Sequence, residues 1–216
     1  MRMITLIQKR WRRFVSLILL LVSACIVGFF SLGISPGCSD SHRRDVRLVY
    51  HALAQYAEND RGNLPLNVYN GDEAPLVSWR FQLAPYLSAA KLPFAVVPNA
   101  TWESSLYKEW RSFSEIGLCP EGSQNAQVQS FCKNGRPWWG YQSFHDMPAD
   151  LMLLCWVNPR FHWMAPHDLD WEDAPESATV ADFLGGDVTV ACADGSVRCL
   201  RGYVRIRDIA DGLFRN

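Results

Sequence analysis

The sequence predicts an α+β fold in which an amphipathic helix packs on an antiparallel β-sheet. Apolar residues repeat at helical spacing after residue 40, and they alternate with other residues on both sides of an Asp-Gly pair at residues 194–195. An uncharged apolar run at residues 14–34 predicts a membrane helix ahead of this domain. We therefore expect a cytoplasmic basic tail and transmembrane anchor at residues 1–38, and an extracytoplasmic domain at residues 39–216.

The composition is that of an ordinary globular chain. Of its 216 residues, 49% are hydrophobic and 20% are charged, which is enough to build one core beside a membrane anchor. The net charge of −1 gives the whole chain no excess of positive charge for nucleic acid. We expect no nucleic-acid partner.

The membrane helix is predicted from length and from flanking charge. At about 1.5 Å per residue, a helix over residues 14–34 reaches about 30 Å, the thickness of a bilayer core. Four basic residues precede it: Lys9, Arg10, Arg12 and Arg13. Basic residues beside a membrane helix stay in the cytoplasm. The sequence thus predicts a single-pass protein of the bacterial inner membrane with its C-terminal domain in the periplasm.

Two kinds of processing would remove this helix. Residues 22–25, Val-Ser-Ala-Cys, look like a lipoprotein cleavage box, and cleavage there would leave a lipid on Cys25. Residues 26–30 are apolar, however, whereas a mature lipoprotein usually begins with polar residues. Signal cleavage near residues 35–37 is the other alternative. The apolar run is longer than the roughly 7–15 residues of a signal peptide core, so we favour a retained helix.

The first long element of the domain is predicted to be a helix. Its apolar residues recur three or four positions apart: Val46, Val49, Leu53 and Tyr56. Residues 39–41 offer an N-cap, and residues 59–62 offer a stop. Further along, residues 78–83 predict a short helix, and the apolar run at residues 151–157 predicts a buried strand.

The strongest strand signal surrounds Asp194 and Gly195. Residues 187–193 and 196–201 are expected to pair as a hairpin, because an Asp-Gly pair between alternating runs favours a two-residue type I′ turn. In that register Cys192 lies opposite Val197, and both Cys192 and Cys199 face the core. We therefore expect both thiols to be reduced and buried, and Asp194 and Gly195 to be structural turn residues.

The seven cysteines form no Cys-x-x-Cys pair, which removes the main support for a zinc ribbon or a thioredoxin-like site. In an oxidising compartment some of them are expected to pair. Cys119 and Cys132 lie in a stretch rich in loop-forming residues, and we expect a disulfide between them. Closing such a loop would stabilise the fold by about 3 kcal/mol in the chain-entropy model.

Six segments lie in the same order as in one known family: RRDVRLVYHALAQYAENDRGNLPL, SWRFQLAPYL, TWESSLYKEW, LCPEG, LMLLCWV followed by WMAPHDL, and GGDVTVACADGSVRCL. Together they resemble the planctomycete pseudopilin-like family called domain of unknown function 1559. The resemblance covers nearly all of the domain after the anchor. It implies a pseudopilin-like fold, a place in the cell envelope and a structural or protein-interaction role.

The chain departs from that family at three points. Members usually open with a type IV pilin leader, Gly-Phe-Thr-Leu-Ile-Glu, and no such sequence precedes residue 14. The family's histidine ahead of the Asp-Gly pair falls on Leu184, and the glutamate of its core strand falls on Cys155. Filament assembly and any chemistry of those polar residues are therefore not implied for this chain.

We expect no catalytic, cofactor-binding or metal-binding residues, and hence no enzyme. A metal site at His162 and His167, with Asp168, Glu172 and Asp173 nearby, is disfavoured because Pro166 keeps the two imidazoles off one helix face. Cys155 acting with either histidine is the enzyme alternative, and a ligand-binding lipoprotein is the third hypothesis. The expected partners are the lipid bilayer and an unidentified envelope protein.

Overall fold

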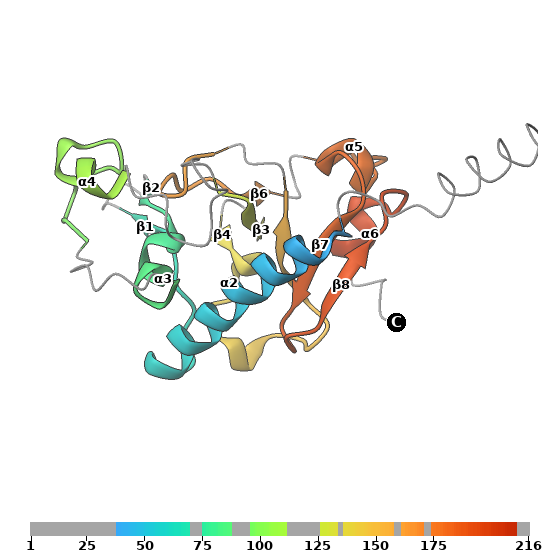
Figure 1. Cartoon of the computed structure of the whole chain (residues 1–216), viewed down its shortest axis with the longest axis horizontal. Coiled ribbons are helices and arrows are strands. Elements are labelled where there is room, and N and C mark those ends of the chain that lie inside the picture. Colours follow the sequence, from blue (N-terminus) through green and yellow to red (C-terminus); the bar gives the residue numbers. More distant parts are fainter. Residues whose placement is uncertain are drawn as a thin grey trace, which may run out of the picture. The chain divides into compact units, whose positions relative to one another are not determined.

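The computed structural model describes residues 38–69, 75–87, 96–111, 126–133, 136–157, 161–170 and 174–210 (Figure 1). All of them belong to one compact unit, Pro36–Asn216, and their fold is α+β with antiparallel sheets, as the sequence predicts. The membrane helix expected at residues 14–34 lies outside the described residues. No helix in the described ranges has the length and apolar character needed to cross a bilayer.

Helix α2, Asp40–Asn59, confirms the predicted amphipathic helix. The hydroxyl of Ser39 caps its first turn by accepting a hydrogen bond from the backbone N–H of His42 at 3.4 Å. Its buried stripe faces the sheet: Val46, Val49, Ala52, Leu53 and Ala57. The helix ends at Asn59 with Asp60 as its C-cap, and the chain turns away through Arg61 and Gly62, which have φ of 57° and 88°. The N–H of Gly62 donates to the carbonyl of Ala57 at 2.7 Å.

The main sheet has the strand order β4-β3-β5-β7-β8, with antiparallel neighbours along this path and β6 parallel to β3. Its strands are β3 (Val128–Lys133), β4 (Arg136–Pro137), β5 (Met152–Trp156), β6 (Leu169–Asp170), β7 (Val188–Cys192) and β8 (Val197–Leu200). A separate ribbon pairs β1 (Val68–Tyr69) with β2 (Pro75–Val77). The remaining α-helices are α3 (Trp79–Leu87), α4 (Lys108–Arg111), α5 (Val180–Leu184) and α6 (Ile206–Ala210). Strand β5 and helix α3 confirm the elements predicted near residues 151–157 and 78–83.

The main sheet carries a core on each face. On one face, α2 lies across the strands (Figure 1), and its apolar stripe packs against residues such as Leu154 and Ala191. On the other face, Val180 of α5 and Ile206 of α6 pack against residues such as Val190. Because side chains alternate along a strand, the register of each pairing decides which of its residues enters which core.

The predicted hairpin is confirmed, but the predicted register is wrong by one residue. Ala191 pairs with Val197, and Thr189 pairs with Cys199. The loop therefore has three residues, 193–195, with Gly195 in the left-handed region at φ of 80°. A shift of one residue turns every side chain of β8 to the opposite face. Cys199 consequently faces α2 instead of sharing the face of Cys192.

Contacts from three directions hold this loop in its three-residue form. The hydroxyl of Tyr50 on α2 donates to the carbonyl of Ala193 at 2.8 Å. The backbone N–H of Asp194 donates to the carbonyl of Ala149 at 2.8 Å. The carboxylate of Asp194 accepts from the N–H of Ser196 at 2.8 Å. Hydrogen bonding from the Ser196 side chain, and secondarily from its N–H, lowers the pKa of Asp194. Asp194 and Gly195 are therefore turn residues with structural contacts.

We predict that Gly195→Val lowers the free energy of unfolding by about 1–3 kcal/mol, because a side chain there must adopt a positive φ. A Cβ at this position would also lie 3.0 Å from a ring carbon of Tyr50. Asp194→Asn is the matched control and should change stability by less than about 0.5 kcal/mol, because asparagine suits the same turn. Chemical denaturation followed by tryptophan fluorescence measures both. Equal stability of the two variants would contradict the three-residue loop.

Candidate functional site

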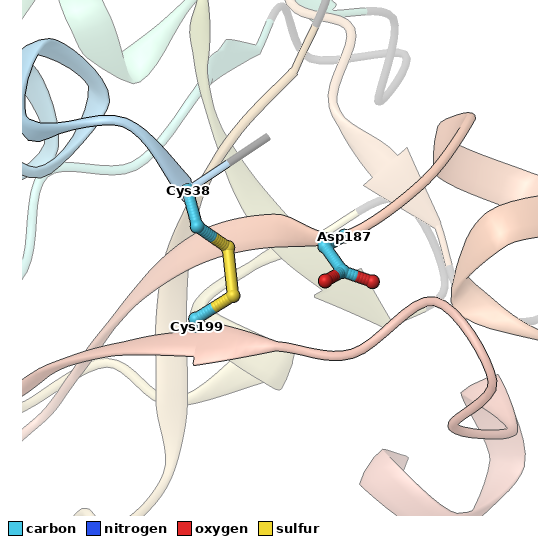
Figure 2. A group of neighbouring side chains, drawn as sticks. All are labelled: Cys38, Asp187 and Cys199. Atoms are coloured by element: carbon cyan, nitrogen blue, oxygen red, sulfur yellow. A yellow bond between two sulfur atoms is a disulfide. The ribbon is translucent and has the colours of Figure 1, made fainter. Parts of the chain in front are cut away.

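A disulfide joins Cys38, just before α2, to Cys199 on β8 (Figure 2). The two Cα atoms are 5.7 Å apart, although 161 positions separate them in the sequence. The expectation that Cys199 is a reduced, buried thiol is therefore wrong. The physical reason is the hairpin register, which turns Cys199 toward the first residues of α2.

Asp187 lies beside this disulfide (Figure 2). One of its carboxylate oxygens and the sulfur atoms of Cys38 and Cys199 all lie within 4.8 Å of one another. Its Oδ1 accepts from the N–H of Gly202 at 2.6 Å, and its Oδ2 accepts from Nη1 of Arg201 at 2.9 Å. Asp187 and Cys199 share a face of the hairpin because Cys199 pairs with Thr189, two residues further along β7.

A second polar group, the guanidinium of Arg80, lies inside the domain. Arg80 belongs to α3, and its side chain is 1% exposed. Its Nε donates to the carbonyl of Val128 at 3.2 Å, and its Nη1 donates to the hydroxyl of Ser78 at 2.9 Å and to the carbonyl of His167. Its Nη2 donates to the carboxylate of Asp168. A buried cation is tolerated only when its donors are satisfied in this way.

Asp168 completes the network from the other side. Its side chain is also 1% exposed, and it accepts from the N–H of Ser130 at 2.9 Å and from the indole of Trp79 at 2.8 Å. Burial raises the pKa of Asp168, while Arg80 and the hydrogen bonds from Ser130 and Trp79 oppose that rise. The network ties α3 to β3 and to the segment before β6. Its burial keeps these charges from substrate, so we assign it a structural role.

The structure gives His162 no free nitrogen for a metal. Its Nδ1 accepts from the N–H of Met164 at 3.2 Å, so its Nε2 carries the proton and donates to the carbonyl of Arg111 at 3.2 Å. Burial lowers the pKa of His162, and its ring stacks on Trp102. His167 is exposed, with its ring beside Phe161. Glu172 and Asp173 lie outside the described residues.

Three cysteines of the described part are free and buried: Cys132, Cys155 and Cys192. Burial raises the pKa of each of these thiols, which leaves little thiolate for nucleophilic attack. Cys155 packs in the core beneath α5 and α6, whereas the Trp102 ring that stacks on His162 packs against the core on the other face. The enzyme alternative built on Cys155 and His162 therefore gains no support from their placement.

The predicted disulfide between Cys119 and Cys132 involves a residue that the structure does not describe. Cys132 is buried, with its sulfur 3.6 Å from the hydroxyl of Ser130. Cys119 lies outside the described residues, so the pairing stays a prediction.

Sequence reasoning missed both the Cys38–Cys199 bond and the Arg80–Asp168 pair. The pairing of seven cysteines cannot be read from their spacing in the sequence. Only a correct hairpin register would have predicted that Cys199 lies on the face of β8 that packs against α2. No local pattern joins residues 80 and 168, which meet only when α3 packs beside β3.

Comparison of the chain with protein-family models, with curated proteins and with solved structures finds no significant match.

We predict that removing the Cys38–Cys199 disulfide, with Cys38→Ser and Cys199→Ser together, lowers the free energy of unfolding by up to about 5 kcal/mol. The chain-entropy model gives this figure for a loop of this length. Denaturation in the presence and absence of a dithiol measures it: the dithiol should destabilise the wild-type chain more than the double variant. Alkylation of both cysteines in the denatured, unreduced wild-type chain would show that the bond does not form.

We predict that Asp168→Asn lowers the free energy of unfolding by about 3–5 kcal/mol, because it leaves the buried guanidinium of Arg80 without its counter-charge. Asp187→Asn is the matched control. Its partner Arg201 is 53% exposed, and exposed pairs contribute about 1 kcal/mol or less. Chemical denaturation of the two variants side by side measures the difference. A loss at Asp168 no larger than that at Asp187 would contradict the proposed structural role.

Proposed function

We propose that this chain is a non-enzymatic, single-pass membrane protein of the bacterial cell envelope, with a pseudopilin-like domain after residue 38 and a structural or protein-interaction role. The observation that carries this proposal is the Cys38–Cys199 disulfide. Structural disulfides form and persist in oxidising compartments and are rare in the cytosol. A domain on the periplasmic side of the inner membrane would meet that condition.

The position of the disulfide also fits an anchored protein. Cys38 stands four residues after the end of the apolar run at residues 14–34. The basic residues before that run favour a cytoplasmic N-terminus, which would carry Cys38 and the whole domain to the far side of the membrane. The bond then joins the chain emerging from the membrane directly to the sheet.

The chemistry of the described residues supports a non-enzymatic role. The free thiols of the described residues are buried and have raised pKa values. The Arg80–Asp168 pair is enclosed, and both nitrogens of His162 are engaged. These groups are used to hold the fold together, and each is poorly placed to act on a substrate.

Among the described residues, the turn between β8 and α6 exposes the large hydrophobic side chain with the highest accessibility. Tyr203 is 81% exposed there, between the exposed residues Arg201 and Arg205. Tyrosine and arginine are enriched among the residues that dominate protein–protein binding. We assign the interaction role to this turn, and Tyr203→Ser is the variant that should weaken capture of the partner without changing stability.

We predict that the protein stays in the membrane fraction after alkaline washing and that its mature form retains residues 14–34. When the outer membrane alone is permeabilised, added protease should degrade the domain while a cytoplasmic marker survives. A variant with Leu19→Arg and Leu20→Arg is the control and should lose membrane retention, because charge at a helix centre opposes insertion.

Other outcomes of the same experiment would overturn the proposal. A lipidated chain beginning at Cys25 would support the lipoprotein hypothesis, and a chain cut near residues 35–37 would exclude a retained anchor. Protection of the domain from protease, together with free Cys38 and Cys199 thiols, would place it in the cytoplasm.

A further inference from the structure

The first part of α2, residues 40–45, is made entirely of polar and charged residues, Asp-Ser-His-Arg-Arg-Asp. The first buried apolar residue of the helix is Val46, and both Arg43 and Arg44 are exposed to solvent. The Cys38–Cys199 disulfide lies at one end of this segment, and the apolar core begins at the other. The disulfide is therefore the strongest connection between residues 40–45 and the sheet.

A ring contact also joins this segment to the sheet. His42 stacks on Trp156 of β5, with ring centroids 3.4 Å apart and an angle of 13° between the rings. The buried Nδ1 of His42 and the buried Nε1 of Trp156 have no hydrogen-bond partner among the described residues. Buried polar atoms without a partner cost free energy, and both nitrogens would bind water if the segment moved away. The ion pair of Arg44 with Asp45, at 3.7 Å, joins neighbours along the helix and does not reach the sheet.

We propose that the peptide bond between Arg43 and Arg44 is a redox-controlled cleavage site for a protease that cuts after arginine. A dithiol first reduces the Cys38–Cys199 disulfide: it gives two electrons and two protons to the two sulfurs and is itself oxidised to a disulfide. Residues 38–45 then leave the sheet. The protease adds water across the peptide bond, which leaves a carboxylate on Arg43 and an amine on Arg44.

The two fixed ends of the segment explain why the oxidised chain is protected. A protease binds the residues on both sides of the cleaved bond in an extended form. The chain from residue 40 to residue 46 spans about 9 Å as a helix and about 20 Å when it is extended. While Cys38 is bonded to Cys199 and Val46 is buried, the two ends cannot separate to that length. Reduction frees one end, and the segment can then straighten.

The same disulfide keeps the two products of cleavage together. A cut after Arg43 gives one piece that contains Cys38 and a second piece that contains Cys199, and the two are joined through sulfur in the oxidised chain. Release of the domain therefore requires both reduction and cleavage. The cleavage site does not depend on the proposed function, but one consequence rests on it: if residues 14–34 anchor the chain, the released piece leaves the membrane.

Limited digestion with trypsin tests the proposal. The full chain in detergent is either left oxidised or reduced with a dithiol that is then removed without air. We expect a fragment that begins at Arg44 or Asp45, identified by its mass, to form at least about tenfold faster from the reduced chain, because proteolysis follows the population of the open segment. Equal rates of formation in the two samples would overturn the proposal.

Arg47 is an internal control for local opening. It is exposed like Arg43 and Arg44, but it lies beside the buried residue Val46. Cleavage after Arg47 requires apolar side chains to leave the core, so this fragment should form more slowly than the fragment cut after Arg43 or Arg44. Preferred cleavage after Arg47 in the reduced chain would contradict the assigned site.

Arg80 reports on unfolding of the whole domain, because its side chain is buried in the fold. In the reduced chain, cleavage after Arg80 should be much slower than cleavage after Arg43 or Arg44. Equal rates at these sites would overturn the proposal, since the disulfide would then hold the entire domain together and not only the start of α2.

Variants assign the effect to these residues. Cys38→Ser should be cut without any dithiol as fast as the reduced wild-type chain. Arg43→Gln together with Arg44→Gln should remove the fragment, and Arg47→Gln is the matched control that should leave it unchanged. Continued protection of Cys38→Ser would overturn the proposal.

Digestion of isolated membranes separates this inference from the proposed function. Release of the domain only after both reduction and digestion would support the two together. A chain that is absent from membranes but shows the redox-dependent cut when purified would contradict the anchor and leave the cleavage site standing. A membrane-bound chain that is cut equally in both redox states would contradict the cleavage site and leave the anchor standing.

Discussion

The three-residue loop at residues 193–195 is the constraint on which the arrangement around β8 depends. Gly195 takes a positive φ there, and Tyr50 and Ala149 hold the neighbouring backbone through hydrogen bonds. The loop fixes the register of β7 and β8, and the register decides which face each side chain of β8 occupies. With one residue fewer in the loop, Cys199 would point away from α2, and the bond to Cys38 could not form. A local turn thereby determines a covalent link across 161 positions of the chain.

The Arg80–Asp168 pair plays a comparable part in a different region. A buried ion pair adds little net stability compared with apolar residues of the same size, but it is costly to break. Here each charge is held by several partners, so that α3, β3 and the segment leading into β6 fit together in one arrangement. The parallel pairing of β6 with β3 begins at Leu169, directly after Asp168. We infer that the pair specifies how these elements meet, while the apolar cores on both sides of the sheet supply most of the stability.

Features of the fold that are determined by residues close together in the sequence could be predicted, whereas features that depend on tertiary contacts could not. The stripe of Val46, Val49 and Leu53 identified α2, and the Asp-Gly pair identified the hairpin, because both signals are local. The loop length was not readable, since Asp-Gly suits both a two-residue turn and the last two positions of a three-residue loop. Because the two-residue turn was assumed, Cys199 was predicted on the wrong face of β8, and its disulfide with Cys38 was not predicted. Arg80 and Asp168, which meet only through tertiary packing, left no pattern in the sequence.

The disulfide also determines how the domain carries a load. A pull on the chain before Cys38 would, without the bond, act on the first turn of α2 and peel the helix from the sheet one turn at a time. With the bond, the force enters β8 at Cys199, and β8 is hydrogen-bonded along its length to β7. Force applied at Cys199 is then shared with the hydrogen bonds between β7 and β8. With the bond in place, tension on the chain before Cys38 is passed to the sheet, and α2 stays over the core. The disulfide is in this sense a fixed connection between Cys38, just before α2, and strand β8.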